Sequence, residues 1–86
     1  MSEESSLIYN KALDILSRRE HSAEELIFKL ERKFDSTEEI LLTVSKLKKN
    51  NLLNDFRYAE AYVVARKKKG FGPKKIKFEL LSKGID

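Results

Sequence analysis

The sequence predicts an all-α protein. Apolar residues recur at i, i+3, i+4 and i+7 through most of the chain, which is the spacing of a helix buried on one face. No strand-like alternation of apolar and polar residues persists, and the single proline, Pro73, stands where a helix can begin. Charged residues make up 37% of the 86-residue chain, which favours a helical protein over a sheet protein. We therefore expect helices joined by short turns.

Three helices are predicted in the first half. The first covers about residues 7–19, after a flexible N-terminus at residues 1–6. The second follows Ser22 and the third follows Ser36, because each serine has a glutamate three residues later, as in a capping box. The third helix ends at the pair 50–51, two asparagines. The residues expected to be buried are Ile8, Ala12, Ile15 and Leu16, then Ala23, Leu26, Ile27, Leu30 and Phe34, then Ile40, Leu41, Val44 and Leu47.

Two further helices are predicted in the second half. The fourth begins near Asn54 or Asp55, both good N-caps, and reaches Lys69. Residues 70–73 then interrupt the chain, and a fifth helix covers about residues 73–83 before Gly84 stops it. The residues expected to point inward are Tyr58, Ala59, Tyr62 and Val63 in the fourth helix, and Ile76, Leu80 and Leu81 in the fifth.

The chain also resembles itself at a spacing of fifty residues. His21, which precedes a helix cap, matches Phe71, and both are expected to pack on the residue five positions later. We therefore expect tandem three-helix repeats: a complete first repeat at residues 7–53 and a second at 54–86 that is truncated after two helices. Because a repeat buries its apolar face against its neighbours, the last two helices should expose apolar surface. A longer parent chain, a partner or self-association would cover it. The other matched positions are Leu26, Phe28, Leu30 and Lys33 with Ile76, Phe78, Leu80 and Lys83, and, in the helix before each, Leu13 with Val63 and Arg18 and Arg19 with Lys68 and Lys69.

The composition argues against chemistry at an active site. The chain has no cysteine and one histidine, His21, which excludes thiolate and His-rich metal sites. The glutamate pairs at 24–25 and 38–39 fall in first helical turns, where negative charge complements the helix dipole. We therefore expect no catalytic residues, no metal and no cofactor. The longest apolar run, residues 61–65, is too short to span a membrane, and no secretory signal is evident, so a cytoplasmic protein is expected.

Positive charge is concentrated in one part of the chain. Residues 1–43 hold 6 basic and 10 acidic side chains, a net of −4, whereas residues 44–86 hold 12 and 4, a net of +8. The basic side chains clustered around the turn at 70–73 could bind phosphate or an acidic protein surface. The simpler alternative is that these lysines only keep the protein in solution. Tyr58 and Tyr62 are expected in the core rather than stacked on bases. The predicted basic patch consists of Arg66, Lys67, Lys68, Lys69, Lys74, Lys75 and Lys77.

Three segments together resemble the RecX family of bacterial recombination regulators. Residues 16–30 (LSRREHSAEELIFKL) resemble the signature of its first repeat, and residues 53–63 (LNDFRYAEAYV) resemble the start of its second. Residues 70–80 (GFGPKKIKFEL), followed by KGI at 83–85, resemble its best-known stretch. The motif positions carried here are Arg19, Glu20, His21, Ser22, Glu25, Leu26, Lys29, Leu30, Asp55, Ala59, Arg66, Gly72, Pro73, Glu79, Leu80, Gly84 and Ile85.

The resemblance implies tandem three-helix repeats without catalytic residues. It further implies binding to the RecA recombinase filament on single-stranded DNA, with inhibition of strand exchange, ATPase and coprotease activity. Family members normally complete the second repeat and add a third, so the chain is expected to be an N-terminal portion or a short member. Two alternatives stay open: a stand-alone DNA-binding module without sequence preference, and a helical interaction domain that does not touch nucleic acid.

Overall fold

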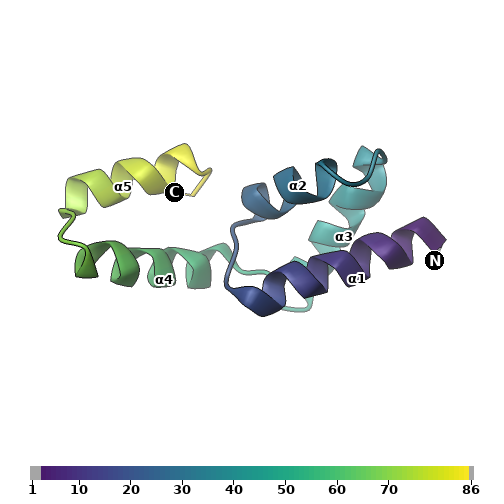
Figure 1. Cartoon of the computed structure of the whole chain (residues 1–86), viewed down its shortest axis with the longest axis horizontal. Helices are drawn as coiled ribbons and strands as arrows, with labels where there is room; N and C mark the ends of the chain where they lie inside the picture. The colour runs from purple at the N-terminus through teal and green to yellow at the C-terminus, as the bar shows by residue number, and fades with distance from the viewer. Residues whose placement is uncertain (1–2, 86) are drawn as a thin grey trace.

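A computed structural model describes residues 3–85, and within them the chain forms five α-helices and no strand. The helices are α1 (Glu3–Arg18), α2 (Ala23–Glu31), α3 (Thr37–Lys49), α4 (Asp55–Lys68) and α5 (Pro73–Ser82). In Figure 1, α1, α2 and α3 form one body, and α4 and α5 form a hairpin beside it. The all-α prediction is confirmed.

The first three helices enclose the main core. Leu26, Leu30, Ile40 and Leu47 are fully buried, and they pack with the buried face of α1. One prediction was wrong here: Leu41 is 49% exposed, while Thr43 is buried in its place. A helix of 3.6 residues per turn drifts relative to a simple i, i+3, i+4 pattern, and the face of α3 toward α1 and α2 is centred on residues 40, 43, 44 and 47.

The helix beginnings follow the predicted caps, except at the N-terminus. Ser22 and Glu25 form the reciprocal capping box, and the Ser36 hydroxyl accepts from the backbone N–H of Glu39 at 3.3 Å. The predicted capping box at Ser36 is only half formed, because the Glu39 carboxylate accepts from the hydroxyl of Ser5 in α1 and not from the backbone N–H of Ser36. The first helix begins at Glu3 rather than at Leu7, because two glutamates in its first turn complement the helix dipole. Residues 3–6 are therefore helical, and the rest of the expected flexible segment lies outside the described residues.

Three helices end in the same way. The chain turns left-handed at Asn51 (φ 59°), Gly70 (φ 89°) and Gly84 (φ 81°), after α3, α4 and α5 respectively. In each case the next residue donates its N–H to the carbonyl five positions back, as from Ile85 to Leu80 at 3.0 Å. This is the Schellman motif, which favours glycine or asparagine because a positive φ strains other side chains. The predicted stops at Asn51 and Gly84 are confirmed.

The α4–α5 hairpin has little core of its own. Tyr58 and Ile76 are buried in it, whereas Leu81, which we expected to be buried, is 51% exposed. Val64 and Phe78 are also exposed, so the hairpin presents the apolar surface that the repeat predicts. The matched phenylalanines Phe28 and Phe78 are both exposed. Ile85 then buries itself at the end of the hairpin, beside α2 at Gly84.

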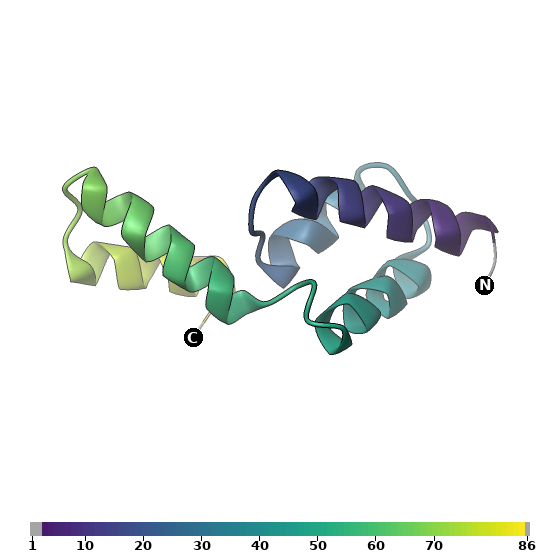
Figure 2. The ribbon, with the colours of Figure 1, turned by 90° about the horizontal axis from the view of Figure 1, so that it is seen from below.

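The molecule is elongated, with extents of 45 × 20 × 19 Å and a radius of gyration of 14.1 Å. A compact chain of this length has a radius of gyration of about 12 Å. Figure 2 shows the cause, which is that the hairpin extends away from the three-helix body along the long axis instead of folding back over it.

Candidate functional site

The predicted basic patch lies at the far end of the hairpin, where α4 ends and α5 begins (Figure 1). Its lysines are exposed, and no ion pair within residues 3–85 joins any of them to a carboxylate. Lys75 stands over the ring of Phe71 at 5.0 Å. Five lysines therefore remain directed at solvent: Lys67, Lys68, Lys69, Lys74 and Lys77.

Arg66, the seventh member of the predicted patch, is occupied inside the hairpin. Its Nε and Nη2 atoms donate to the two carboxylate oxygens of Glu79 at 3.1 and 2.9 Å. The guanidinium also lies 3.7 Å from the ring centre of Phe71, the residue that closes the Schellman turn. Such a bidentate pair fixes geometry as well as charge. Arg66 thus joins α4 to α5, and its charge is neutralised by Glu79.

The same pair sets the ionisation of its neighbours. Burial opposes ionisation of Glu79, but hydrogen bonds from Arg66 and Tyr62 prevail and hold the pKa of this carboxyl below its usual value. Tyr62 responds in the opposite direction, because burial and its hydrogen bond to Glu79 raise the pKa of the phenol. Arg66, Glu79 and Tyr62 therefore stabilise the hairpin, and the positive charge that it exposes to solvent comes from the lysines.

A second polar cluster joins the hairpin to the three-helix body. Asp55, the first residue of α4, accepts from the backbone N–H of Ala23 at 2.8 Å, and Ala23 is the first residue of α2. Arg57 donates to Glu20 at 3.0 Å. Tyr58 is buried, as predicted, and burial together with the nearby charge of Glu25 raises its pKa to about 12. The starts of α2 and α4 are therefore held together by polar contacts.

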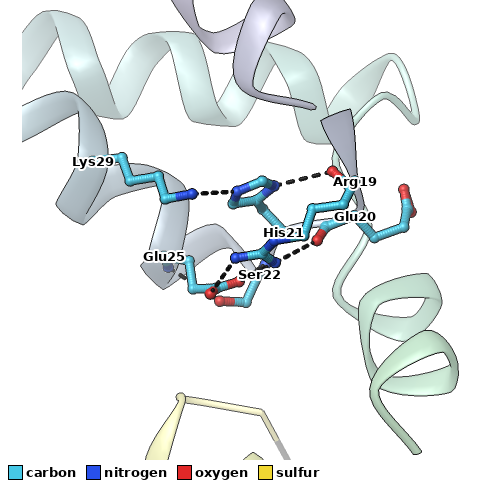
Figure 3. Close-up of polar contacts among 6 residues, drawn as sticks. All are labelled: Arg19, Glu20, His21, Ser22, Glu25 and Lys29. Atoms are coloured by element: carbon cyan, nitrogen blue, oxygen red, sulfur yellow. Dashed lines mark hydrogen bonds and ion pairs between the residues drawn. The ribbon is translucent and has the colours of Figure 1, made fainter. Parts of the chain in front are cut away.

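Arg19 and Glu25 form an ion pair beside this junction, in the turn from α1 to α2, which Figure 3 shows in detail. The Arg19 guanidinium donates to both oxygens of Glu25, at 3.3 and 3.1 Å. Glu25 also accepts from the backbone N–H of Ser22 at 3.2 Å. Burial opposes the charge of Glu25, but the hydrogen bonds from Arg19 and Ser22 lower its pKa below the usual value. One carboxylate thus caps α2 and anchors the end of the α1–α2 turn.

His21 lies beneath this turn and is only 2% exposed. Its Nδ1 atom is 3.0 Å from the carbonyl oxygen of Arg19, and its Nε2 atom is 2.7 Å from Nζ of Lys29 (Figure 3). Since a carbonyl only accepts and an ammonium only donates, Nδ1 carries the proton and Nε2 is the acceptor. His21 is therefore a neutral imidazole that holds Lys29.

The stability of the fold should fall as His21 becomes protonated. Burial, together with the charges of Arg19 and Lys29, lowers the pKa of His21 below its ordinary value of about 6.5. Below that pH the unfolded chain takes up a proton that the folded chain resists, so the folded state loses stability as the pH falls. We expect a smaller free energy of unfolding at pH 5 than at pH 7.5, measured by urea titration.

The matched variant for this measurement is His21→Phe, because phenylalanine occupies the equivalent position 71 in the second repeat. It should flatten the dependence of unfolding free energy on pH across this range. An equal slope in both proteins would show that another group is responsible.

Sequence reasoning missed a third feature, a groove between α1 and α2 with a volume of about 760 Å³. Its positive side chains are Lys11 and Arg18, two turns apart on α1, Arg19 after it, and Lys29, Arg32 and Lys33 on and just after α2. The spacing alone contained a signal, because positions seven apart, and three or four apart, share a helix face. The net charge of −4 over residues 1–43 concealed it, since many of the acidic residues there lie in first helical turns elsewhere.

No helix in residues 3–85 combines the length and apolar character needed to cross a membrane. The same residues contain no group of three or more His, Cys, Asp or Glu side chains arranged to hold a metal ion.

Comparison with known proteins gives a consistent result over both parts of the chain. Residues 9–47 match the RecX first three-helix domain, and residues 54–86 match the RecX second three-helix domain. A Regulatory protein RecX from Legionella pneumophila (strain Corby) is 40% identical over 78 residues, which are 91% of this chain and 52% of that protein. One from Mannheimia succiniciproducens is 40% identical over 81 residues, covering 93% and 53%. One from Pseudomonas putida (strain W619) is 37% identical over 75 residues, covering 87% and 48%. The chain thus spans about half the length of these relatives.

Proposed function

The chain belongs to the RecX family, and from this premise we propose that it binds the RecA recombinase filament on single-stranded DNA and inhibits or modulates recombination, ATPase and coprotease activity. It acts by binding and not by catalysing a reaction, and it does so in the cytoplasm. The observation that carries the proposal is the set of exposed, unpaired lysines at the end of the hairpin. The hairpin holds these lysines at its far end, so they can contact a surface that the three-helix body does not reach.

The lysines, rather than Arg66, supply this charge, because Glu79 neutralises Arg66. Their targets are phosphates of the bound DNA or an acidic surface of RecA. If the targets are phosphates, each contact with single-stranded DNA adds about 0.7 to the slope of affinity against salt on logarithmic axes. If α2 and α3 acted as a helix-turn-helix, α3 would be the helix that reads the bases. It contains no arginine, the residue most often used to recognise guanine, and this argues against sequence-specific binding.

The test is the ATPase activity of RecA on single-stranded DNA, titrated with this chain. We expect inhibition by the natural chain and weaker inhibition by the double variant Lys67→Glu/Lys68→Glu. The matched control is Lys48→Glu/Lys49→Glu, which changes the same charge at the same place, the last two residues of a helix, but on α3. Inhibition at sub-stoichiometric ratios would indicate action at filament ends.

No inhibition by the natural chain would contradict the proposal. Equal effects of the two variants would contradict the assignment of the hairpin lysines while leaving the activity in place.

A second candidate function is favoured by the exposed apolar side chains of the hairpin, namely Val64, Phe78 and Leu81. These suit a protein partner or a second copy of the chain, with the lysines serving solubility. Such binding would be nearly indifferent to salt, whereas a stand-alone DNA-binding module would bind DNA equally well without RecA and with strong salt dependence. The salt dependence of binding separates apolar docking from DNA binding, and the RecA ATPase titration separates a RecA regulator from a module that binds DNA alone.

A further inference from the structure

The positive residues of the first half of the chain converge on one place. Residues 1–43 contain six lysines and arginines, and every one of them lines the groove between α1 and α2. They come from separate segments, at positions 11–19 and 29–33, so the convergence is produced by folding and not by a run in the sequence. Clustering like charges costs free energy unless something compensates for it.

The compensation within the chain is incomplete. Asp14 is the one carboxylate among the residues that line the groove, and it pairs with both Lys11 and Arg18, at 3.6 and 3.5 Å. Arg19 pairs with Glu25. Lys29 contacts a neutral imidazole, and neither Arg32 nor Lys33 forms an ion pair in the described part of the chain. The end of the groove nearest α2 therefore carries uncompensated positive charge.

The internal repeat shows that half of these charges are not required by the helices themselves. Fifty residues later, Lys11 is replaced by alanine at 61, Lys29 by glutamate at 79, and Arg32 by serine at 82. The other three positions keep a positive charge, as lysines at 68, 69 and 83. The second repeat still forms its pair of helices and uses Glu79 to neutralise Arg66. The same pair of helices thus forms when three of the six cations are replaced, so Lys11, Lys29 and Arg32 are not needed to form it.

The lining of the groove indicates the kind of ligand. Besides the charged residues and His21, it contains one apolar residue, Ile15, and no Phe, Tyr or Trp. Protein partners usually dock through apolar and aromatic anchors, and bases need aromatic faces on which to stack. A surface of lysine and arginine with neither feature suits the phosphodiester backbone, which needs only positive charge and hydrogen-bond donors.

We propose that the α1–α2 groove is a second nucleic-acid contact, which binds the phosphodiester backbone of single-stranded DNA without regard to base sequence. It is separate from the hairpin lysines, which lie at the opposite end of the hairpin from the three-helix body (Figure 1), and it does not require RecA. Lys29, Arg32 and Lys33 contact the phosphates. His21 is a positioning residue that holds the Lys29 ammonium at the groove (Figure 3).

The test is fluorescence anisotropy of a labelled oligo-dT with the whole chain and no RecA, over a series of salt concentrations. We expect Arg32→Glu/Lys33→Glu to weaken binding and to lower the salt slope by about 1.4, which is two phosphate contacts at ~0.7 each. A mixed-sequence oligonucleotide should show the same loss. The matched control is Lys48→Glu/Lys49→Glu on α3, and Arg32→Gln/Lys33→Gln tests the same contacts without added negative charge. Circular dichroism spectra check that the helices are retained in each variant.

The alternatives give different results. An equal loss of affinity in the α3 control would mean that net charge alone governs binding. A loss of affinity confined to Lys67→Glu/Lys68→Glu would assign all DNA contact to the hairpin. Either result overturns the assignment of DNA binding to the groove. If polyglutamate competes as strongly as unlabelled oligo-dT, the ligand of the groove is an acidic peptide and not the phosphodiester backbone. That result would also overturn the proposal. Failure of RecA inhibition does not affect this experiment, because RecA is absent from it.

Discussion

Leu26→Ala is expected to lower the free energy of unfolding by about 3–5 kcal/mol, because it removes a fully buried leucine from the core of the three-helix body. A small domain is stable by only about 5–15 kcal/mol in total, so this loss is a large part of the total. Thermal unfolding followed by circular dichroism should show Tm lowered by more than about 12 °C.

The control for this prediction is Leu42→Ala on α3, where the leucine is 58% exposed. Its effect should stay within about 0.5 kcal/mol. Similar losses for the two variants would contradict the arrangement of α2 against α1 and α3 described above.

Asp55→Ala is expected to separate the hairpin from the three-helix body. The substitution leaves the N–H of Ala23 without its acceptor, and Ala23 is buried, so the cost is about 1–3 kcal/mol. The amide of Ala23 should lose protection from hydrogen exchange, and probes on α4 should unfold at lower urea concentration than probes on α1.

The variant Asp55→Asn keeps an oxygen at the same position but removes the charge, so it should retain most of the protection at Ala23. Equal exchange rates in Asp55→Ala and the natural chain would mean that other contacts hold the two parts together.

Most of the helical structure was predictable because its determinants are local. The cap at Ser22, the break at residues 70–73 and the stops at Asn51 and Gly84 each depend on neighbouring residues. Burial was predicted less well, since it depends on which face meets another helix. Leu41 and Leu81 fit a helical stripe, yet no other helix covers them in the described structure.

The candidate sites show the same division. A run of lysines around a turn is visible in the sequence, and these lysines are exposed as expected for such a run. The role of Arg66 was not visible, because Glu79 lies 13 residues away and meets it only when the hairpin closes. The groove was missed for a similar reason: its cations are divided between two helices, and the net charge of the surrounding segment has the opposite sign.

The elongated outline also determines how the molecule rotates in solution. A body 45 Å long and about 20 Å wide spins about its long axis faster than it tumbles end over end. Since α1 and α5 run close to that axis, whereas α4 is inclined to it (Figures 1 and 2), the N–H bonds in α1 and α5 point nearly along it and sense mainly the slower motion. The relaxation rate of each backbone amide therefore depends on the angle between its N–H bond and the long axis. If one long axis accounts for the rates in both parts, the hairpin and the three-helix body rotate as one rigid particle.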